Sequence, residues 1–284
     1  MNVAPARPAA FLNMTAYPLF LSGEKEGGCL FSWMKINGLR EDIAALRRGF
    51  GPICRGIFRG RGEAGLSISF DDDYVDEWYS IRGLFAGYGA RATFFVSKFD
   101  LLTEESIEKL RVLRDDGHEI AFHGLRHLSA GRFVAEHSLD KYLETEIFPG
   151  IDAMTGKGFS PETFSYPYGV RSPRIDAALL KYFRRVRGVV CANGERRPAD
   201  FRQVYCRRGE GLVFAVGIDN IYRNSVEEIA LAMKKAKDRN RTLLIFAHKT
   251  SDESCNYCTP ASRIEAVLEC ASKAGLKFHR MKDL

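Results

Sequence analysis

The stretch Leu66-Ser67-Ile68-Ser69-Phe70-Asp71-Asp72-Asp73 decides the fold, because a short apolar run ends there in carboxylates and similar runs recur along the chain. Longer segments separate the runs, and their apolar residues repeat every three or four positions, as in amphipathic helices. The runs are Leu66–Phe70, Ala92–Val96, Glu119–Phe122, Thr163–Tyr166, Arg187–Val190, Val213–Ile218, Leu243–Ala247 and Leu276–Phe278. This alternation predicts parallel strands joined by crossover helices, in a barrel or an open sheet.

The segments between the runs are the predicted helices. They cover Glu77–Phe85, Glu104–Arg114, Leu139–Met154, Pro173–Phe183, Ser225–Lys237 and Ala261–Ala274. Ser225 and Glu228 have the spacing of a capping box, and Pro173 suits a first helical turn. Barrels and open parallel sheets both carry their sites at the carboxyl ends of the strands, so catalytic residues are expected directly after the apolar runs.

The composition sets the protein class and leaves the chemistry open. Of 284 residues, 45% are hydrophobic and 27% are charged, which excludes a disordered, collagen-like or coiled-coil chain. The net charge of +6 is too small to require a nucleic-acid partner. Seven cysteines cannot all pair within the chain, which argues for a reducing compartment.

Residues 1–63 fit the alternation poorly, and we interpret them as an N-terminal extension packed on a domain of residues 64–284. A helix is predicted at Leu39–Arg48. The uncharged stretch Pro8–Gly23 is shorter than the roughly 20 apolar residues of a membrane helix, so no stable membrane insertion is expected. Only Arg7 precedes it, and no clear cleavage site follows. We therefore expect a cytoplasmic protein, with a weak N-terminal signal as the alternative.

Two polar clusters at predicted strand ends suit a metal site. Adjacent carboxylates in Asp71-Asp72-Asp73 favour binding a cation or holding a proton, whereas a solvated turn or helix N-cap is the alternative. His123 and His127 lie four residues apart, so both imidazoles can reach one metal, although surface histidines share this spacing. Two imidazoles and one carboxylate leave a position open for water, as catalytic zinc requires.

Two further features follow predicted strands. His248 comes directly after Leu243–Ala247 and is either a satisfied core histidine or, beside a metal site, a general acid. An unperturbed pKa of about 6.5 suits histidine to proton transfer near neutrality. The segment Phe164–Gly169 contains a Pro-Tyr-Gly turn, which can aim a backbone N–H into a cleft or be an ordinary turn.

In this order and spacing the clusters resemble the motifs of the polysaccharide deacetylase family, the NodB-homology group of carbohydrate esterases. The family's Thr-Phe-Asp-Asp-Gly corresponds to Ser69-Phe70-Asp71-Asp72-Asp73, and its His-(Ser/Thr)-x-x-His has Gly124 in the Ser/Thr place. The Pro-Tyr-Gly motif matches Tyr166–Gly169, and the final strand ends in His248. The resemblance covers about residues 64–284. It implies an α/β fold, a distorted (β/α) barrel with about seven parallel strands.

The resemblance also implies a role for each matching residue. One divalent metal ion, expected to be zinc, would be bound by Asp72, His123 and His127. Asp71 would be the general base, the backbone N–H of Tyr168 would stabilise the oxyanion, and protonated His248 would be the general acid. The implied reaction removes an acetyl group from an N-acetylated amino sugar.

Several positions depart from the family pattern. Ser165 stands where many members have an Arg that orients the base, and Arg171 and Arg126 are candidate replacement cations. Asp73 replaces the usual Gly and adds negative charge beside the base. The family's fourth motif, an Asp near a strand end, is matched only loosely by Asp219.

Residues 171–208 carry eleven Lys and Arg against three Asp and Glu, an excess larger than that of the whole chain. One interpretation is solvated surface. The other is a site for an anionic substrate, such as a phosphorylated or nucleotide-linked sugar, with Arg207 and Arg208 near the barrel mouth. The stretch lacks a recognition motif for nucleic acid, so no nucleic-acid partner is expected.

Cys255 and Cys258 lie in the loop after His248, with Tyr257 between them. Reduced thiols are expected there, and a redox-sensitive lid is the alternative. Tyr257 and Trp78 are candidates for stacking on a sugar, with ordinary packing as the alternative.

These features together predict a carbohydrate-acting hydrolase of C–N bonds other than peptide bonds, a metal-dependent N-deacetylase of a glycan or glycan precursor. The alternatives are hydrolysis of another amide in a small metabolite on the same barrel, and an inactive glycan-binding barrel. The sequence leaves open which sugar is used and whether the acetyl group is on nitrogen or oxygen.

Overall fold

The structure, a computed structural model, describes residues 63–190 and 196–284. Apart from Glu63, the predicted N-terminal extension lies outside these residues, and so does its predicted helix at Leu39–Arg48. Among the helices that are described, none combines the length and the apolar composition needed to cross a bilayer.

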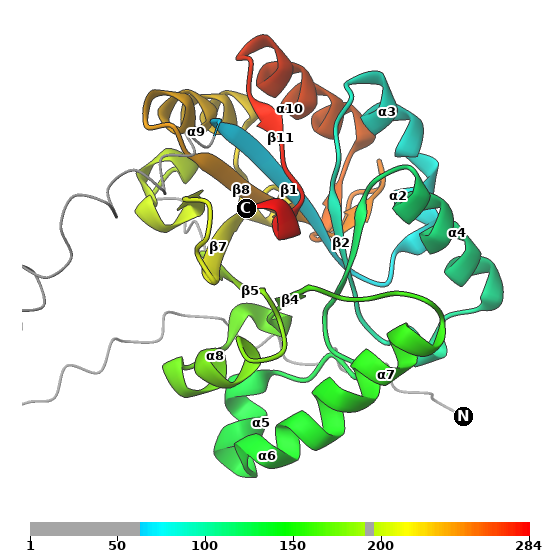
Figure 1. Ribbon diagram of the computed structural model, residues 1–284. Helices are drawn as coiled ribbons and strands as arrows, with labels where there is room; N and C mark the ends of the chain where they lie inside the picture. The colour runs from blue at the N-terminus through cyan, green and yellow to red at the C-terminus, as the bar shows by residue number, and fades with distance from the viewer. Residues whose placement is uncertain (1–62, 191–195) are drawn as a thin grey trace, which may run out of the picture. The chain divides into compact units, whose positions relative to one another are not determined.

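Within the described residues, seven parallel strands form a closed barrel (Figure 1). In their order around the barrel they are β1 (Gly65–Asp72), β2 (Thr93–Val96), β3 (Glu119–Phe122), β4 (Thr163–Ser165), β5 (Arg185–Val190), β7 (Leu212–Gly217) and β8 (Thr242–Ala247). Pairing of β8 with β1, from Gly65 opposite Thr242 to Phe70 opposite Ala247, closes the ring. The predicted distorted (β/α) barrel with about seven strands is confirmed, and the choice between barrel and open sheet is settled.

Short strands border the barrel. β11 (Lys277–Phe278) pairs with the start of β1, as the last apolar run predicts, and β6 (Tyr205–Cys206) runs antiparallel to the start of β8. A separate parallel pair joins β9 (Lys249–Thr250) to β10 (Cys258–Thr259). The last three of these strands, β6, β9 and β10, are too short to produce a recognisable apolar run.

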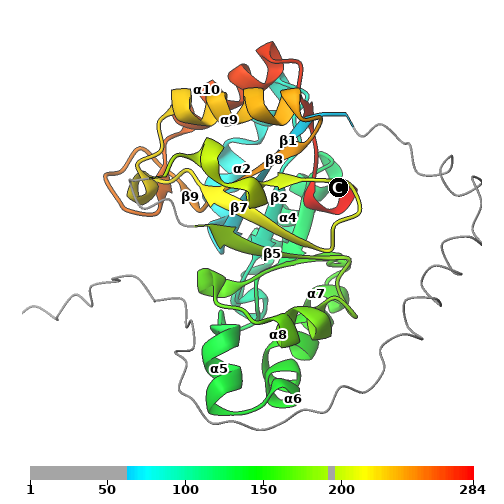
Figure 2. The ribbon, with the colours of Figure 1, turned by 90° about the vertical axis from the view of Figure 1, so that its left-hand side faces the viewer.

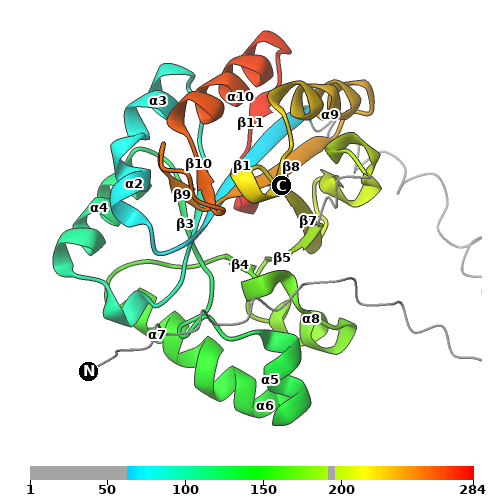
Figure 3. The ribbon, with the colours of Figure 1, turned by 180° about the vertical axis from the view of Figure 1, so that it is seen from behind.

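Helices surround the strands, and α5 to α8 gather on the side away from α9 and α10 (Figures 2 and 3). They are α2 (Val75–Ser80), α3 (Arg82–Gly87), α4 (Glu104–Asp115), α5 (Ala130–Glu136), α6 (Leu139–Tyr142), α7 (Phe148–Gly156), α8 (Pro173–Leu179), α9 (Val226–Asp238) and α10 (Ala261–Lys273). The capping box of α9 forms as expected, with the Ser225 hydroxyl and the Glu228 carboxylate each accepting the other's backbone N–H.

Two predicted helices are interrupted. The segment Glu77–Phe85 divides at Ile81 into α2 and α3. A π-helical turn, Leu143–Ile147, separates α6 from α7 inside the predicted helix Leu139–Met154. A π-helical turn inserts a residue into an otherwise regular helix, so apolar periodicity alone does not reveal it.

Side chains along each strand alternate between the helix-covered outer face and the barrel interior. Ile68 and Phe70 of β1 belong to the large outer apolar cluster. Phe95 of β2 and Phe246 of β8 belong to a second cluster that fills the interior.

A C-terminal turn, Met281–Asp283, closes the amino end of the barrel. The backbone N–H of Met281 donates to the Thr93 hydroxyl (2.8 Å), and that of Lys282 donates to the Glu119 carboxylate (2.9 Å). Burial raises the pKa of Glu119 in this position. With the amino end closed, the carboxyl ends of the strands form the open rim.

Candidate active site

The predicted site residues lie at the carboxyl ends of their strands, as expected. Asp71 and Asp72 are the last residues of β1, and His123 directly follows β3. Tyr168 lies in the turn after β4, and His248 directly follows β8. Residues far apart in the sequence therefore meet at one rim.

The three predicted metal ligands converge. Oδ1 of Asp72 lies 3.1 Å from Nε2 of His127 and 3.6 Å from Nε2 of His123, and the two Nε2 atoms are 3.3 Å apart. Tetrahedral zinc with bonds of about 2.1 Å places its ligand atoms roughly 3.4 Å from one another. The set Asp72, His123 and His127 therefore fits one ion of this kind.

The electrostatics of these side chains suit a cation. Burial lowers the pKa of His123 to about 4, so the imidazole is neutral at physiological pH. Its Nδ1 bonds the backbone carbonyl of Ser165 (2.9 Å), which assigns the proton to Nδ1 and leaves the Nε2 lone pair for a metal. Burial opposes ionisation of Asp72, but the His127 hydrogen bond and the nearby imidazoles lower its pKa on balance.

The predicted base, Asp71, is buried and pairs with Arg187 of β5 through Oδ2. The same guanidinium nitrogen, Nη2, also donates to the Ser165 hydroxyl. Among the described residues, Oδ1 of Asp71 has no hydrogen-bond partner, so one oxygen is free to accept a proton. The cation beside the base therefore comes from the strand next to the one that carries Ser165.

This placement corrects the candidates Arg171 and Arg126. Arg171 instead binds Asp176, which also accepts a hydrogen bond from Tyr166. Arg126 is exposed on the loop between the two histidines. Charge and proximity in sequence suggested these two, whereas the geometry of the barrel selects a residue in the middle of a strand.

Arg187 is completely buried between two aromatic rings. Its guanidinium carbon lies 5.2 Å from the centroid of Phe95 and 4.7 Å from that of Phe246. One signal in the sequence could have identified Arg187. Arg185 and Arg187 are two residues apart in an apolar strand, so their side chains point to the same face, which is the barrel interior.

His248 is held by Asp219, a residue matched only loosely in the sequence. Nδ1 of His248 lies 2.7 Å from Oδ2 of Asp219, and the His248 backbone N–H donates to Oδ1 (3.0 Å). Thr259 also donates to Oδ1 (2.7 Å), and the indole N–H of Trp78 donates to the His248 carbonyl (2.9 Å). Burial opposes protonation of His248, but Asp219 outweighs it and raises the pKa of the imidazole.

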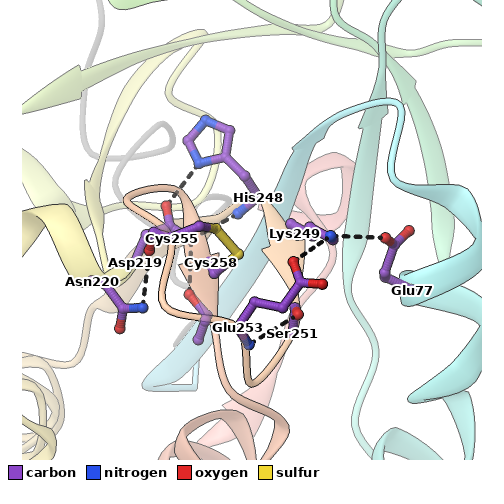
Figure 4. The surroundings of a disulfide bond; sticks show 10 residues. Glu77, Asp219, Asn220, His248, Lys249, Ser251, Glu253, Cys255 and Cys258 are labelled. Carbon is purple, nitrogen blue, oxygen red and sulfur yellow. Dashed lines mark hydrogen bonds and ion pairs between the residues drawn. A yellow bond between two sulfur atoms is a disulfide. The ribbon is translucent and has the colours of Figure 1, made fainter.

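The loop after His248 contains a disulfide between Cys255 and Cys258, where reduced thiols were expected. Figure 4 shows this disulfide beside the hydrogen bond from His248 to Asp219. The Cys255 carbonyl accepts a hydrogen bond from the amide of Asn220 (3.0 Å), which follows Asp219. The cross-linked loop is thus tied to the segment that holds His248.

The two candidates for stacking on a sugar, Trp78 and Tyr257, differ in exposure, and Tyr168 is a third aromatic residue at the rim. Trp78 is fully buried, so it packs in the core and cannot stack on a sugar. Tyr257 is 45% exposed and lies edge-on to His248, with ring centroids 5.0 Å apart. Tyr168 is 68% exposed and lies edge-on to His127, with centroids 4.7 Å apart.

Two further charged features concern the surroundings of the site. Asp73 pairs with Lys98 (3.1 Å), so its charge is compensated beside the site. Arg207 and Arg208 follow β6 and precede the start of β7, at the amino end of the barrel. The alternative interpretation, in which these two arginines lie near the barrel mouth, does not agree with this position, because the strand that follows them runs away from them toward the rim.

Residues 59–184 match the sequence profile of the family described as Polysaccharide deacetylase. This part of the chain is similar to the polysaccharide deacetylase family. The match includes the three metal-ligand candidates and Asp71, whereas Arg187, Asp219 and His248 come from later in the chain. The candidate site therefore also includes residues from strands beyond the matched range.

Solved deacetylases share the fold. The Bc1960 peptidoglycan N-acetylglucosamine deacetylase gives a TM-score of 0.51 at 15% identity, covering 78% of this chain and 87% of that chain. The peptidoglycan deacetylase PdaC from Bacillus subtilis gives 0.50 at 16% identity, covering 78% and 90%. No curated protein matches the chain.

Proposed function

We propose that this protein is a metal-dependent deacetylase that removes acetyl groups from N-acetylated amino sugars of a glycan or glycan precursor. The observation that carries the proposal is the convergence of three metal-ligand atoms on a rim that also holds two proton-transfer groups. One is the Arg-paired carboxylate of Asp71, and the other is the Asp-paired imidazole of His248.

A divalent metal held by Asp72, His123 and His127, zinc by our proposal, would supply a Lewis acid that polarises the acetyl carbonyl and acidifies water. Asp71 accepts the proton of the attacking water through its free oxygen, while Arg187 holds the other oxygen. The backbone N–H of Tyr168 donates to the oxyanion.

Protonated His248 then donates its proton to the departing amine nitrogen, and the products are acetate and a free amino sugar. Asp219 supports this role in two ways. It fixes the orientation of the imidazole through Nδ1, and it favours the protonated form that the acid requires.

The substrate class is supported by relatives with the same fold, two of which are named as peptidoglycan deacetylases. A neutral sugar is favoured over an anionic one, because Arg207 and Arg208 lie at the amino end of the barrel. Assignment of residues 64–284 as the catalytic domain, of residues 1–63 as an extension, and of a cytoplasmic location all remain predictions.

Acetate release from N-acetylglucosamine oligomers tests the proposal. The purified protein should release acetate, lose this activity on chelation, and regain it with added Zn²⁺. Asp71→Asn should reduce turnover by about 10²–10⁴-fold, the usual contribution of a general base, while binding metal normally.

Two outcomes favour the alternatives. Metal-dependent and Asp71-dependent hydrolysis of a small amide without release from glycans would indicate a metabolite amidohydrolase. Glycan binding without any acetate release, in a protein loaded with metal, would indicate an inactive binding barrel.

A further inference from the structure

The loop between the two histidine ligands is held by a buried carboxylate that the proposed reaction does not use. Glu146 is completely buried. Its Oε2 accepts the backbone N–H of Arg126 (2.9 Å), and its Oε1 accepts the backbone N–H of Leu128 (2.9 Å). The two bonds therefore hold the backbone N–H groups of the residues on either side of His127.

The backbone at His127 needs this support. Its φ is 58°, in the left-handed region that residues with a side chain adopt at a cost. Such conformations persist where the surrounding structure holds them in place. Glu146 supplies that restraint at the residue whose Nε2 lies 3.1 Å from Asp72.

Glu146 also explains the glycine between the histidines. Gly124 has a φ of 88°, and a Cβ added there would overlap Oε1 of Glu146. A Ser or Thr at this position, as in the family pattern, is incompatible with the carboxylate as it stands. Gly124 and Glu146 are thus a matched pair.

The local helix geometry places the carboxylate. Glu146 lies in the π-helical turn Leu143–Ile147, between α6 and α7. π-helical turns are rare and are frequent at functional sites, because the inserted residue redirects a side chain out of the regular helical positions. Here the redirected side chain reaches the loop that carries a metal ligand.

We propose that Glu146 is a positioning residue for the metal ligand His127, and that it replaces any side-chain support from position 124. The proposal rests on the metal site of the proposed function. It concerns the affinity for metal, which is measured without substrate.

The test is a zinc titration of the metal-free protein against a chromophoric chelator, at a temperature well below unfolding. Glu146→Ala should weaken zinc binding by about 10–100-fold, as loss of an outer support of a ligand does. Glu146→Gln keeps one acceptor and should give a smaller loss, and it serves as the folded variant if Glu146→Ala does not fold.

The matched control is Glu119, another buried carboxylate that accepts hydrogen bonds from a backbone N–H and from hydroxyls, at the opposite end of the barrel. Glu119→Gln should lower the unfolding temperature and leave zinc affinity unchanged. If Glu146 has a purely structural role, Glu146→Gln should also lower the unfolding temperature and leave zinc affinity unchanged. That result would overturn the proposal.

A double-mutant cycle tests the pairing with Gly124. Gly124→Ser should weaken zinc binding more in the parent than in the Glu146→Ala background. The backbone strain of a serine at positive φ is present in both backgrounds, whereas the overlap with the Glu146 carboxylate is present only in the parent. Equal effects in the two backgrounds would contradict the pairing.

The outcomes separate the two proposals. A parent that binds zinc and releases no acetate, with zinc affinity lowered in Glu146→Ala, refutes the proposed function alone. A parent that releases acetate, with unchanged affinity in the Glu146 variants, refutes the positioning role alone. A parent that binds no metal overturns both.

Discussion

Arg187 in β5 donates a hydrogen bond to Asp71 at the end of β1, so that a cation from one strand holds a carboxylate from another across the barrel interior. Both side chains are almost fully buried. An ion pair buried in this way depends on each partner, because removal of one leaves an uncompensated charge in a medium of low polarity.

Replacement of Arg187 should therefore affect both stability and turnover. Arg187→Ala should lower the free energy of unfolding by about 3–5 kcal/mol. In the folded fraction, acetate release should fall by about 10²-fold, the cost of a misplaced catalytic group. Denaturant unfolding and initial rates measure the two effects, and Arg187→Lys should lose less stability because it keeps the charge.

Arg185 is the matched control, since it is a second buried arginine of β5 whose guanidinium bonds the Lys282 carbonyl near the closed end. Arg185→Ala should lower stability and leave the turnover of folded protein near the parent value. Equal turnover losses in Arg185→Ala and Arg187→Ala would argue against a specific role for the Asp71 pair.

The pKa of His248 should exceed 6.5 in the metal-free protein, because the carboxylate of Asp219 favours the imidazolium. Asp219→Asn removes that charge and should lower the pKa. A general acid works in its protonated form, so activity declines as pH rises through this pKa, and the basic limb of the rate profile should move to lower pH in the variant.

Imidazole chemical shifts followed by NMR titration measure the pKa directly. Thr259→Val is the control, because it removes a hydrogen bond to Asp219 and keeps the charge, and it should shift the pKa less. An unchanged His248 pKa in Asp219→Asn would show that the carboxylate only orients the ring.

Zinc should stabilise the folded protein as well as support turnover. A ligand at one hundred times its Kd adds about 2.7 kcal/mol to the stability of the state that binds it. The unfolding temperature should therefore rise with zinc in the parent. Asp72→Ala removes one of the three proposed ligands, so the rise in unfolding temperature should disappear. If zinc raised the unfolding temperature of this variant as much as that of the parent, the metal would be bound elsewhere.

Reduction of the disulfide should lower turnover and spare metal binding. The Cys255–Cys258 loop carries Tyr257, whose ring packs against His248, but Thr259 still anchors Asp219 when the disulfide is open. We expect a loss of at most about tenfold, equivalent to 1.4 kcal/mol, for the Cys255→Ser and Cys258→Ser double variant.

Cys270→Ser is the control for general effects of thiol removal, because Cys270 is a free cysteine. The parent treated with a dithiol reductant should match the double variant. If reduction abolished zinc binding, the disulfide would be supporting the ligand set instead of the histidine acid.

The strands and the positions of the candidate metal ligands at the rim were predictable, because each is marked locally in the sequence. A buried parallel strand is a continuous apolar run, and the residue after it reaches the rim, as with His123 and His248. The break at Ile81 and the π-helical turn were not predictable, since both arise from packing that leaves the apolar pattern of the segment intact.

The supports of the site were missed for a different reason. Arg187 bonds Asp71, which is 116 positions away in the sequence, and Glu146 bonds Arg126, which is 20 positions away. Neither interaction leaves a local pattern in the sequence. The basic side chains of residues 171–208 form one group in the sequence and separate in the fold. Arg187 faces the barrel interior, whereas Arg207 and Arg208 lie at the amino end of the barrel, away from the rim.

The contact of one Arg187 nitrogen with both Asp71 and Ser165 has a consequence for comparing related chains. Position 165 on β4 and position 187 on β5 are direct neighbours in the parallel pairing, with Ser165 opposite Arg187. The Arg187 guanidinium therefore occupies the space between position 165 and Asp71, where a cation carried by position 165 would also act. A sequence comparison restricted to position 165 would conclude that the chain lacks a cation beside Asp71. A comparison of side-chain distances to Asp71 would find the cation at Arg187.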